Sequence, residues 1–227
     1  MDLLSKNTVS AKNQLKSNEF IKFTDAENQG IRVMFLGNSI TLHGVKKDIG
    51  WNNAWGMAAS AEENDYVHIL MRYVRQITNN PAFCICQGAK WEVHYNEEID
   101  FYNEYSPARD FDADIIIVRL IENCKVRDFN AEKFKKELMQ FIKYLSPNKS
   151  PKIIFTTSFW KHPGDIAIEE LSKEYNSPLV ELGDLGANNE MMAIGLFEHE
   201  GVSIHPGDKG MQNIADRIYN VLKDIIE

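Results

Sequence analysis

One short segment constrains the fold of this chain more than any other: Ile115-Ile-Ile-Val118, four consecutive β-branched residues. A strand with one solvated face alternates apolar and polar residues, whereas a continuous apolar run is typical of a strand buried on both faces. Burial on both faces requires helices above and below the sheet, as in α/β proteins. The segment therefore predicts a central strand of a mostly parallel sheet.

Strand and helix patterns alternate along the rest of the chain, which agrees with this prediction. Further strands are expected at residues 31–36, 82–86, 152–157 and 179–182. One helix is expected to open at a capping box, Ser60-Ala-Glu-Glu63, and to stop at Asn79-Asn-Pro81. Three more helices are expected at residues 131–145, 165–175 and 209–226. The alternation predicts a parallel sheet with helices on both faces.

The length of 227 residues suits one domain. Residues 1–30 are polar and weakly patterned, so we expect an N-terminal arm or a short edge strand packed on a domain spanning 31–227. No basic segment followed by an apolar core marks a signal peptide, and no apolar run is long enough to cross a bilayer. We therefore expect a cytoplasmic protein.

Charge and cysteine usage exclude several function classes. The chain has 25 basic and 33 acidic residues and a net charge of −8, which argues against nucleic-acid backbones and anionic membranes as partners. Cys84, Cys86 and Cys124 lack zinc-site spacing and are expected to be buried, reduced thiols. The glycine-rich signatures of dinucleotide and triphosphate sites are also missing. No metal and no cofactor are predicted.

Four candidate residues fall at the carboxyl-terminal edge of the predicted sheet: Ser39, Gly88, Asn123 and His205. Ligand and catalytic sites of parallel sheets form at this edge. A serine there can act as a nucleophile, a histidine as its base, and an asparagine amide or a glycine N–H as a donor to an oxyanion. Each residue alone also fits a structural role, as a helix cap, a turn or a surface loop residue. Their combination favours acyl transfer.

The segments that carry these residues resemble those of the SGNH hydrolase superfamily, the GDSL-type lipases and esterases. Gly37-Asn-Ser-Ile40 matches the first block of the family, Gly88 and Asn123 match the second and third, and His205-Pro-Gly-Asp-Lys-Gly-Met211 matches the last. The four blocks occur in the chain order of the family. The resemblance covers nearly all of the chain after residue 30.

This resemblance implies a flavodoxin-like three-layer αβα sandwich with a five-stranded parallel sheet. It implies that Ser39 is the nucleophile and His205 its base. It also implies an oxyanion hole formed by the N–H groups of Ser39 and Gly88 and by the side chain of Asn123.

The chain departs from the family pattern at two places. The third block usually reads Gly-x-Asn-Asp, but here it is Ile121-Glu-Asn-Cys124, whose first side chain we expect to narrow the cleft. The family also places an Asp three residues before its histidine, where this chain has Val202. Either a backbone carbonyl orients His205, giving a Ser–His dyad, or a nearby acid such as Glu198 or Glu200 does so. We favour the dyad, because no acid has the expected spacing.

Candidates for the substrate cleft are His43, Trp51, Trp55 and Glu122. The two Trp side chains either wall the cleft, stacking on a sugar ring, or fasten their loop to the domain, which is the commoner role of buried Trp. Five polar residues with no metal-site spacing are expected to form a solvated loop: Glu92, His94, Glu97, Glu98 and Asp100.

Together these features predict a serine esterase that acts on small carboxylic esters, such as O-acetyl groups on carbohydrates or short acyl esters. The alternative is a non-catalytic carbohydrate- or ligand-binding protein on the same fold, which the Val202 departure keeps open. A flavodoxin-like nucleotide binder is a weaker alternative. The sequence does not predict an oligomeric state.

Overall fold

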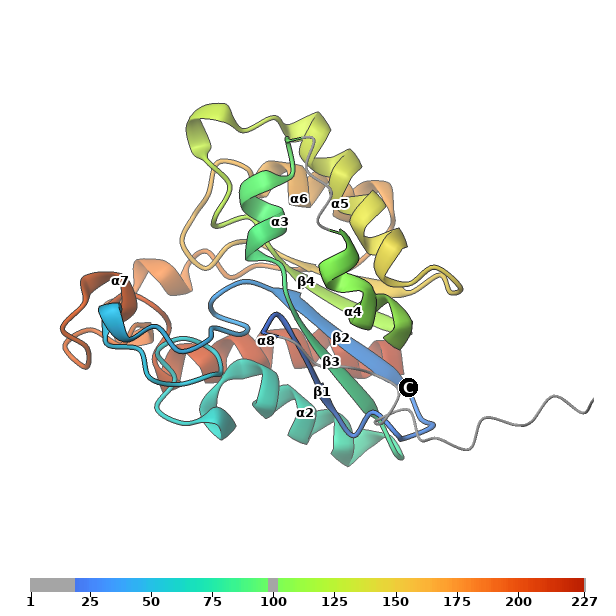
Figure 1. Cartoon of the computed structure of the whole chain (residues 1–227), viewed down its shortest axis with the longest axis horizontal. Coiled ribbons are helices and arrows are strands. Elements are labelled where there is room, and N and C mark those ends of the chain that lie inside the picture. The colour runs from blue at the N-terminus through green and yellow to red at the C-terminus, as the bar shows by residue number, and fades with distance from the viewer. Residues whose placement is uncertain (1–18, 98–101, 227) are drawn as a thin grey trace, which may run out of the picture.

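The protein is described here from a computed structural model that covers residues 19–97 and 102–226. Its centre is a six-stranded sheet with the strand order β1-β3-β2-β4-β5-β6 (Figure 1). The strands are β1 (Ile21–Thr24), β2 (Arg32–Gly37), β3 (Ala82–Gln87), β4 (Ile115–Arg119), β5 (Lys152–Thr156) and β6 (Leu179–Val180). β4 lies between β2 and β5 and is buried along its whole length, which confirms the prediction from the apolar run.

Helices cover both faces of the sheet, so the molecule has three layers (Figure 1). The helices are α2 (Tyr66–Ile77), α3 (Ala89–His94), α4 (Ser106–Phe111), α5 (Ala131–Leu145), α6 (Asp165–Glu174), α7 (Glu200–Ser203) and α8 (Asp208–Ile226). Alternate strand residues point to opposite faces. Val33 and Phe35 pack with α2 and α8, whereas Met34 and Leu36 pack with α3, α4, α5 and α6.

The predicted fold class is confirmed, and the strand count differs by one. Five strands are parallel, and β1 is added at the edge, antiparallel to β3. Without β1, the edge of β3 would expose unpaired backbone groups. β1 lies within the segment expected to be an arm or an edge strand. The division at residue 30 stays a prediction, and residues 1–18 lie outside the described part of the chain.

The predicted capping box at residues 60–63 is wrong. The Ser60 hydroxyl donates to the carboxylate of Asp208 at 2.6 Å, which fastens this loop to the start of α8. The helix begins later, after Asp65, whose buried carboxylate accepts from the N–H of His68 at 2.8 Å. Asp65 caps the helix in place of Ser60. Its carboxylate also accepts from the N–H of Gly56, which lies in the loop after β2.

A third apolar cluster lies outside the sheet and its two covering layers. Its buried members are Trp51, Met57, Ala58, Ala193 and Val202, with Ile49, Trp55 and Phe197 packed against them. We call this cluster the loop lobe. It joins the long loop after β2 to the segments around α7, which lie side by side in Figure 1.

Two smaller findings concern other predictions. All three cysteines are buried and free, as expected. Among the described residues, no helix is both long and apolar enough to span a membrane.

Candidate active site

The structure brings Ser39 and His205 together from positions 166 residues apart. Ser39 follows β2 in a tight turn, in which the N–H of Thr41 donates to the carbonyl of Asn38 at 2.9 Å. His205 lies in the short segment between α7 and α8. The distance between Ser39 Oγ and His205 Nε2 is 2.9 Å, which is within hydrogen-bond range.

The second ring nitrogen of His205 determines what the first can do. His205 Nδ1 lies 2.6 Å from the carbonyl oxygen of Gly201. A carbonyl only accepts, so Nδ1 carries the proton and the lone pair of Nε2 faces the Ser39 hydroxyl. Burial, assisted by the nearby charges of Arg119 and His43 and opposed by the hydrogen bond to Gly201, lowers the pKa of His205 to about 4. The ring is therefore neutral at pH 7 and able to accept a proton.

Val202 occupies the position where an acid is usual, and its side chain is buried in the loop lobe. The residue that follows the start of α7, Gly201, supplies the acceptor to His205 instead. Among the described residues, neither Glu198 nor Glu200 forms a hydrogen bond or ion pair with the ring. The dyad arrangement is therefore the one that the structure contains.

Two of the three predicted oxyanion donors are free to act. Among the described residues, no hydrogen bond uses the Ser39 N–H. Asn123 Nδ2 donates one hydrogen to Glu92 Oε2 at 2.6 Å, which leaves its second hydrogen free. The N–H of Gly88, however, donates to the carbonyl of Gly37 at 2.5 Å. This bond extends the parallel β2–β3 pairing by one residue, so the structure does not present Gly88 as a free donor.

A buried polar network lies directly behind these groups. Asn38 Nδ2 donates to Glu122 at 2.6 Å and to Glu92 at 3.2 Å, and Asn38 Oδ1 accepts from Arg119 at 2.9 Å. Arg119 also forms two bonds to Glu122 Oε1, at 2.6 and 2.7 Å. Burial and the charge of Glu122 raise the pKa of Glu92 above its ordinary range. Glu122 thus pairs with the buried guanidinium of Arg119, and Asn38, in the turn that carries Ser39, donates to both carboxylates.

Comparison with solved structures identifies the fold. A putative GDSL-like lipase from Parabacteroides merdae superposes with a TM-score of 0.56 at 15% identity, covering 87% of this chain and 96% of that one. A psychrotrophic esterase from Pseudoalteromonas superposes with a TM-score of 0.54 at 14% identity, covering 86% and 98%. An acetyl xylan esterase gives a TM-score of 0.54 at 17% identity, covering 85% and 100%. This chain has the SGNH hydrolase fold. No protein-family profile matches the sequence, and no curated protein matches it by sequence.

The first residue of the third block of the SGNH pattern shows why glycine is usual there. Ile121 has φ = 148°, a region that favours glycine, and its side chain is fully buried. Its N–H donates to Glu92 Oε1. The side chain packs against Gly164 and the apolar core instead of narrowing the cleft, so that expectation is wrong.

Glu122 was expected to line the substrate cleft, and that prediction is also wrong. Its side chain is only 6% exposed. Besides Arg119 and Asn38, the N–H of Phe159 donates to it, at 3.0 Å. Both oxygens bind buried neighbours, so the carboxylate belongs to the network behind the site and does not line the cleft.

The polar cluster expected to be solvated is divided by the structure. Glu92 is fully buried on α3, so the prediction is wrong for this residue. His94 and Glu97 pair at the surface at 2.9 Å. Glu98 and Asp100 lie outside the described residues. No group of metal-ligating side chains occurs within the described part of the chain.

The two tryptophans of the loop after β2 fasten this loop to the domain. Trp51 is fully buried in the loop lobe and donates to the carbonyl of His43 at 3.3 Å, so it cannot wall a cleft. Trp55 is half-buried, packs edge-to-face on Trp51 and donates to the carbonyl of Ala59 at 3.0 Å. His43 is half-buried and close enough to His205 for its charge to affect that ring. Of the four predicted cleft residues, His43 best keeps that assignment.

Sequence reasoning missed Trp160, which contacts the base directly. Its ring packs edge-on against His205, with 5.0 Å between ring centroids and an angle of 78°. Its Nε1 is buried and has no hydrogen-bond partner among the described residues. Trp160 lies in the loop after β5, at the same edge of the sheet as the other candidates. The rule that sites form at this edge was a signal that could have identified it.

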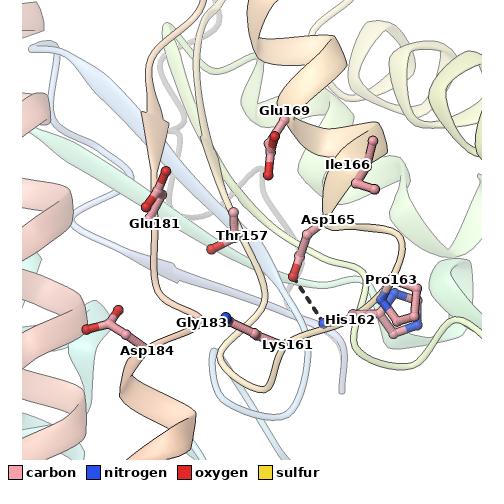
Figure 2. Close-up of a pocket in the computed structure, with 10 residues that line it drawn as sticks. All are labelled: Thr157, Lys161, His162, Pro163, Asp165, Ile166, Glu169, Glu181, Gly183 and Asp184. Atoms are coloured by element: carbon pink, nitrogen blue, oxygen red, sulfur yellow. Dashed lines mark hydrogen bonds between the residues drawn. The ribbon is translucent and has the colours of Figure 1, made fainter.

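The loop that carries Trp160 also borders a pocket of about 610 Å³ at the carboxyl-terminal ends of β5 and β6 (Figure 2). Asp165, at the start of α6, holds this loop by accepting from the Ser158 hydroxyl at 2.6 Å and from the N–H of His162 at 3.1 Å. Three charged side chains that line the pocket form no hydrogen bond or ion pair among the described residues: Lys161, Glu169 and Glu181. Neither Ser39 nor His205 lines it.

Proposed function

We propose that this chain is a serine esterase that hydrolyses small carboxylic esters, with O-acetyl groups on carbohydrates as its substrate class. The observation that carries the proposal is the Ser39–His205 pair, whose hydrogen bond and ring tautomer suit a nucleophile and its base. The two free donors beside it, the Ser39 N–H and Asn123 Nδ2, suit an oxyanion hole.

In the proposed reaction, Ser39 Oγ bonds to the acyl carbon while its proton passes to His205 Nε2. The carbonyl oxygen becomes an oxyanion, which accepts from the N–H of Ser39 and from the amide of Asn123. When the ester bond breaks, His205 returns the proton to the leaving alcohol. Water then attacks the acyl-enzyme with His205 again as base, releasing the acid and restoring Ser39.

The dyad affects the expected rate. A buried carboxylate would stabilise the imidazolium that forms in each step, but a neutral carbonyl such as that of Gly201 stabilises it less. The low pKa of His205 also makes it a weak base. We therefore expect slower turnover than in an enzyme with a full triad.

Three structural neighbours support the choice of substrate. They are the acetyl xylan esterase, a two-domain esterase active on acetylated mannans and a family two carbohydrate esterase from Cellvibrio japonicus.

Covalent labelling tests the mechanism. A fluorophosphonate is expected to label the wild-type protein at one residue, and Ser39→Ala is expected to abolish the label. Ser150→Ala is the matched control, because Ser150 is exposed on a distant loop before β5. Folded wild-type protein that takes no label would contradict the proposal and favour the non-catalytic binding protein.

A substrate series tests the specificity. We expect acetylated xylo- and manno-oligosaccharides and p-nitrophenyl acetate to be hydrolysed, and p-nitrophenyl octanoate to be hydrolysed at least about tenfold more slowly. Ser39→Ala is expected to lower kcat about 10³-fold or more. Equal rates for acetyl and octanoyl esters would contradict the assignment of a small acyl group.

A further inference from the structure

A single buried carboxylate connects three segments of the candidate site. Glu92, on α3, is fully buried, and its Oε1 accepts from Asn38 Nδ2 at 3.2 Å and from the N–H of Ile121. Its Oε2 accepts from Asn123 Nδ2 at 2.6 Å. The same carboxylate therefore binds the turn that carries Ser39, the backbone just after β4, and the side chain of Asn123.

Asn123 depends on this contact for its orientation. The residue is exposed, and its bond to Glu92 is the one hydrogen bond that its side chain makes among the described residues. A rotation of 180° about the last side-chain torsion exchanges the nitrogen and oxygen of an amide. In that flipped state, an oxygen lone pair would replace the N–H donor. Burial raises the pKa of Glu92 to about 7. Above that pH its ionised carboxylate only accepts, so it holds the nitrogen of Asn123 and rejects the flipped state.

We propose that Glu92 is a positioning residue for ester hydrolysis, which fixes the amide of Asn123 so that its second N–H stays available to the oxyanion. This inference rests on the proposed esterase function. In this inference Glu92 does not contact the substrate. It stabilises the transition state by holding the side chain of Asn123 in place.

Glu122 provides the matched comparison. It lies in the same buried network and binds Asn38 and Arg119, but among the described residues its side chain forms no hydrogen bond with that of Asn123. A role limited to holding the network together would make the two carboxylates equivalent. A positioning role through Asn123 makes them different.

A double-mutant cycle distinguishes these cases, with kcat and KM for p-nitrophenyl acetate measured on folded protein. Glu92→Gln keeps the shape of the side chain but turns an N–H₂ donor toward one of its three donors. We expect it to lower kcat about 10–100-fold with KM changed less than about twofold, because removing one oxyanion donor costs about 10²–10³-fold. In the Asn123→Ala background the same substitution is expected to have no further effect. The loss caused by Glu122→Gln is expected to persist in that background.

Each outcome decides the question. A normal kcat in Glu92→Gln, or losses that multiply in the double variant, would overturn the inference and leave the esterase function intact. A wild-type protein without activity would overturn both. If Glu92→Gln does not fold, Glu92→Asp takes its place, since its shorter carboxylate cannot span all three donors. Failure of both variants to fold would assign Glu92 a structural role and overturn the proposal.

Discussion

The two halves of the candidate site are held by different forces. Behind Ser39 and Asn123 lies a buried network of charges and amides, centred on Arg119, Glu92 and Glu122. Around His205, the holding elements are the apolar loop lobe, the edge of Trp160 and one backbone carbonyl. The nucleophile side is therefore rigid through directional bonds, whereas the base side depends on packing.

The difference shows what a missing acid costs. In a triad, a carboxylate fixes the ring of the base by charge and direction. Here the position three residues before His205 is occupied by Val202, whose side chain packs in the loop lobe. The lobe in turn holds the segment that carries His205. Packing can set the position of a ring, but it gives no charge to stabilise the imidazolium. The following predictions test this contrast, from the largest expected effect to the smallest.

The largest effect is expected on the nucleophile side, from Arg119→Met. Removing the guanidinium leaves the buried carboxylate of Glu122 without its cation, which costs about 3–5 kcal/mol of unfolding free energy. Urea unfolding monitored by circular dichroism measures this loss. The double variant Arg119→Met with Glu122→Gln is expected to recover part of it, because it removes the carboxylate charge that Arg119→Met leaves unpaired. Unchanged stability in Arg119→Met would show that the network contributes no rigidity.

An intermediate effect is expected on the base side, from Val202→Asp. The substitution restores the usual acid in sequence, but it places a carboxylate among buried apolar side chains beside Trp51. We expect a loss of about 2–3 kcal/mol in stability and no gain in kcat. Val202→Asn separates the effect of charge from that of polarity. A rise in kcat for the Asp variant would mean that the lobe rearranges to form a triad.

The smallest effect is expected in the pH profile of the wild-type enzyme. His205 must be neutral to act as base, so kcat/KM falls as pH drops through its pKa of about 4. As far as the ionisation of His205 alone limits the rate, roughly nine tenths of the activity is expected to remain at pH 5, against roughly one thirtieth for a histidine of ordinary pKa near 6.5. Steady-state rates between pH 4 and 8, checked for enzyme stability at each pH, measure this. An acid limb near pH 6.5 that persists in Glu92→Gln would indicate that the base is more solvated than the structure shows, whereas a limb that disappears in this variant would belong to Glu92, whose pKa burial raises to about 7.

The layers of the fold and the two central residues were predictable because their signals are local. The run at residues 115–118 identified the central strand, and the segment around Ser39 matched the first block of a known pattern. The side-chain partners were not predictable in this way. Glu92 looked like one of several acids in a solvated loop, because burial depends on how α3 packs and not on local composition.

The same limit applies to Trp51 and Glu122, which were assigned to the cleft from their place in the sequence. Both follow strands at the correct edge of the sheet, but a position after a strand does not show which way a side chain points. Trp51 turns into the loop lobe, and Glu122 turns toward Arg119. Trp160 was missed because no candidate was assigned from sequence to the loop after β5, although this loop follows a strand at the same edge of the sheet.

Because of the loop lobe, activity can be lost on heating at a lower temperature than the one at which the domain unfolds. The lobe is a cluster of its own, apart from the two that cover the sheet, so it can loosen while the sheet stays folded. Heating that opens it would move His205 away from Ser39 before helix or strand content changes. The upper temperature for turnover is then determined by a few side chains in loops, and a protein that still looks folded to circular dichroism would already have lost its base.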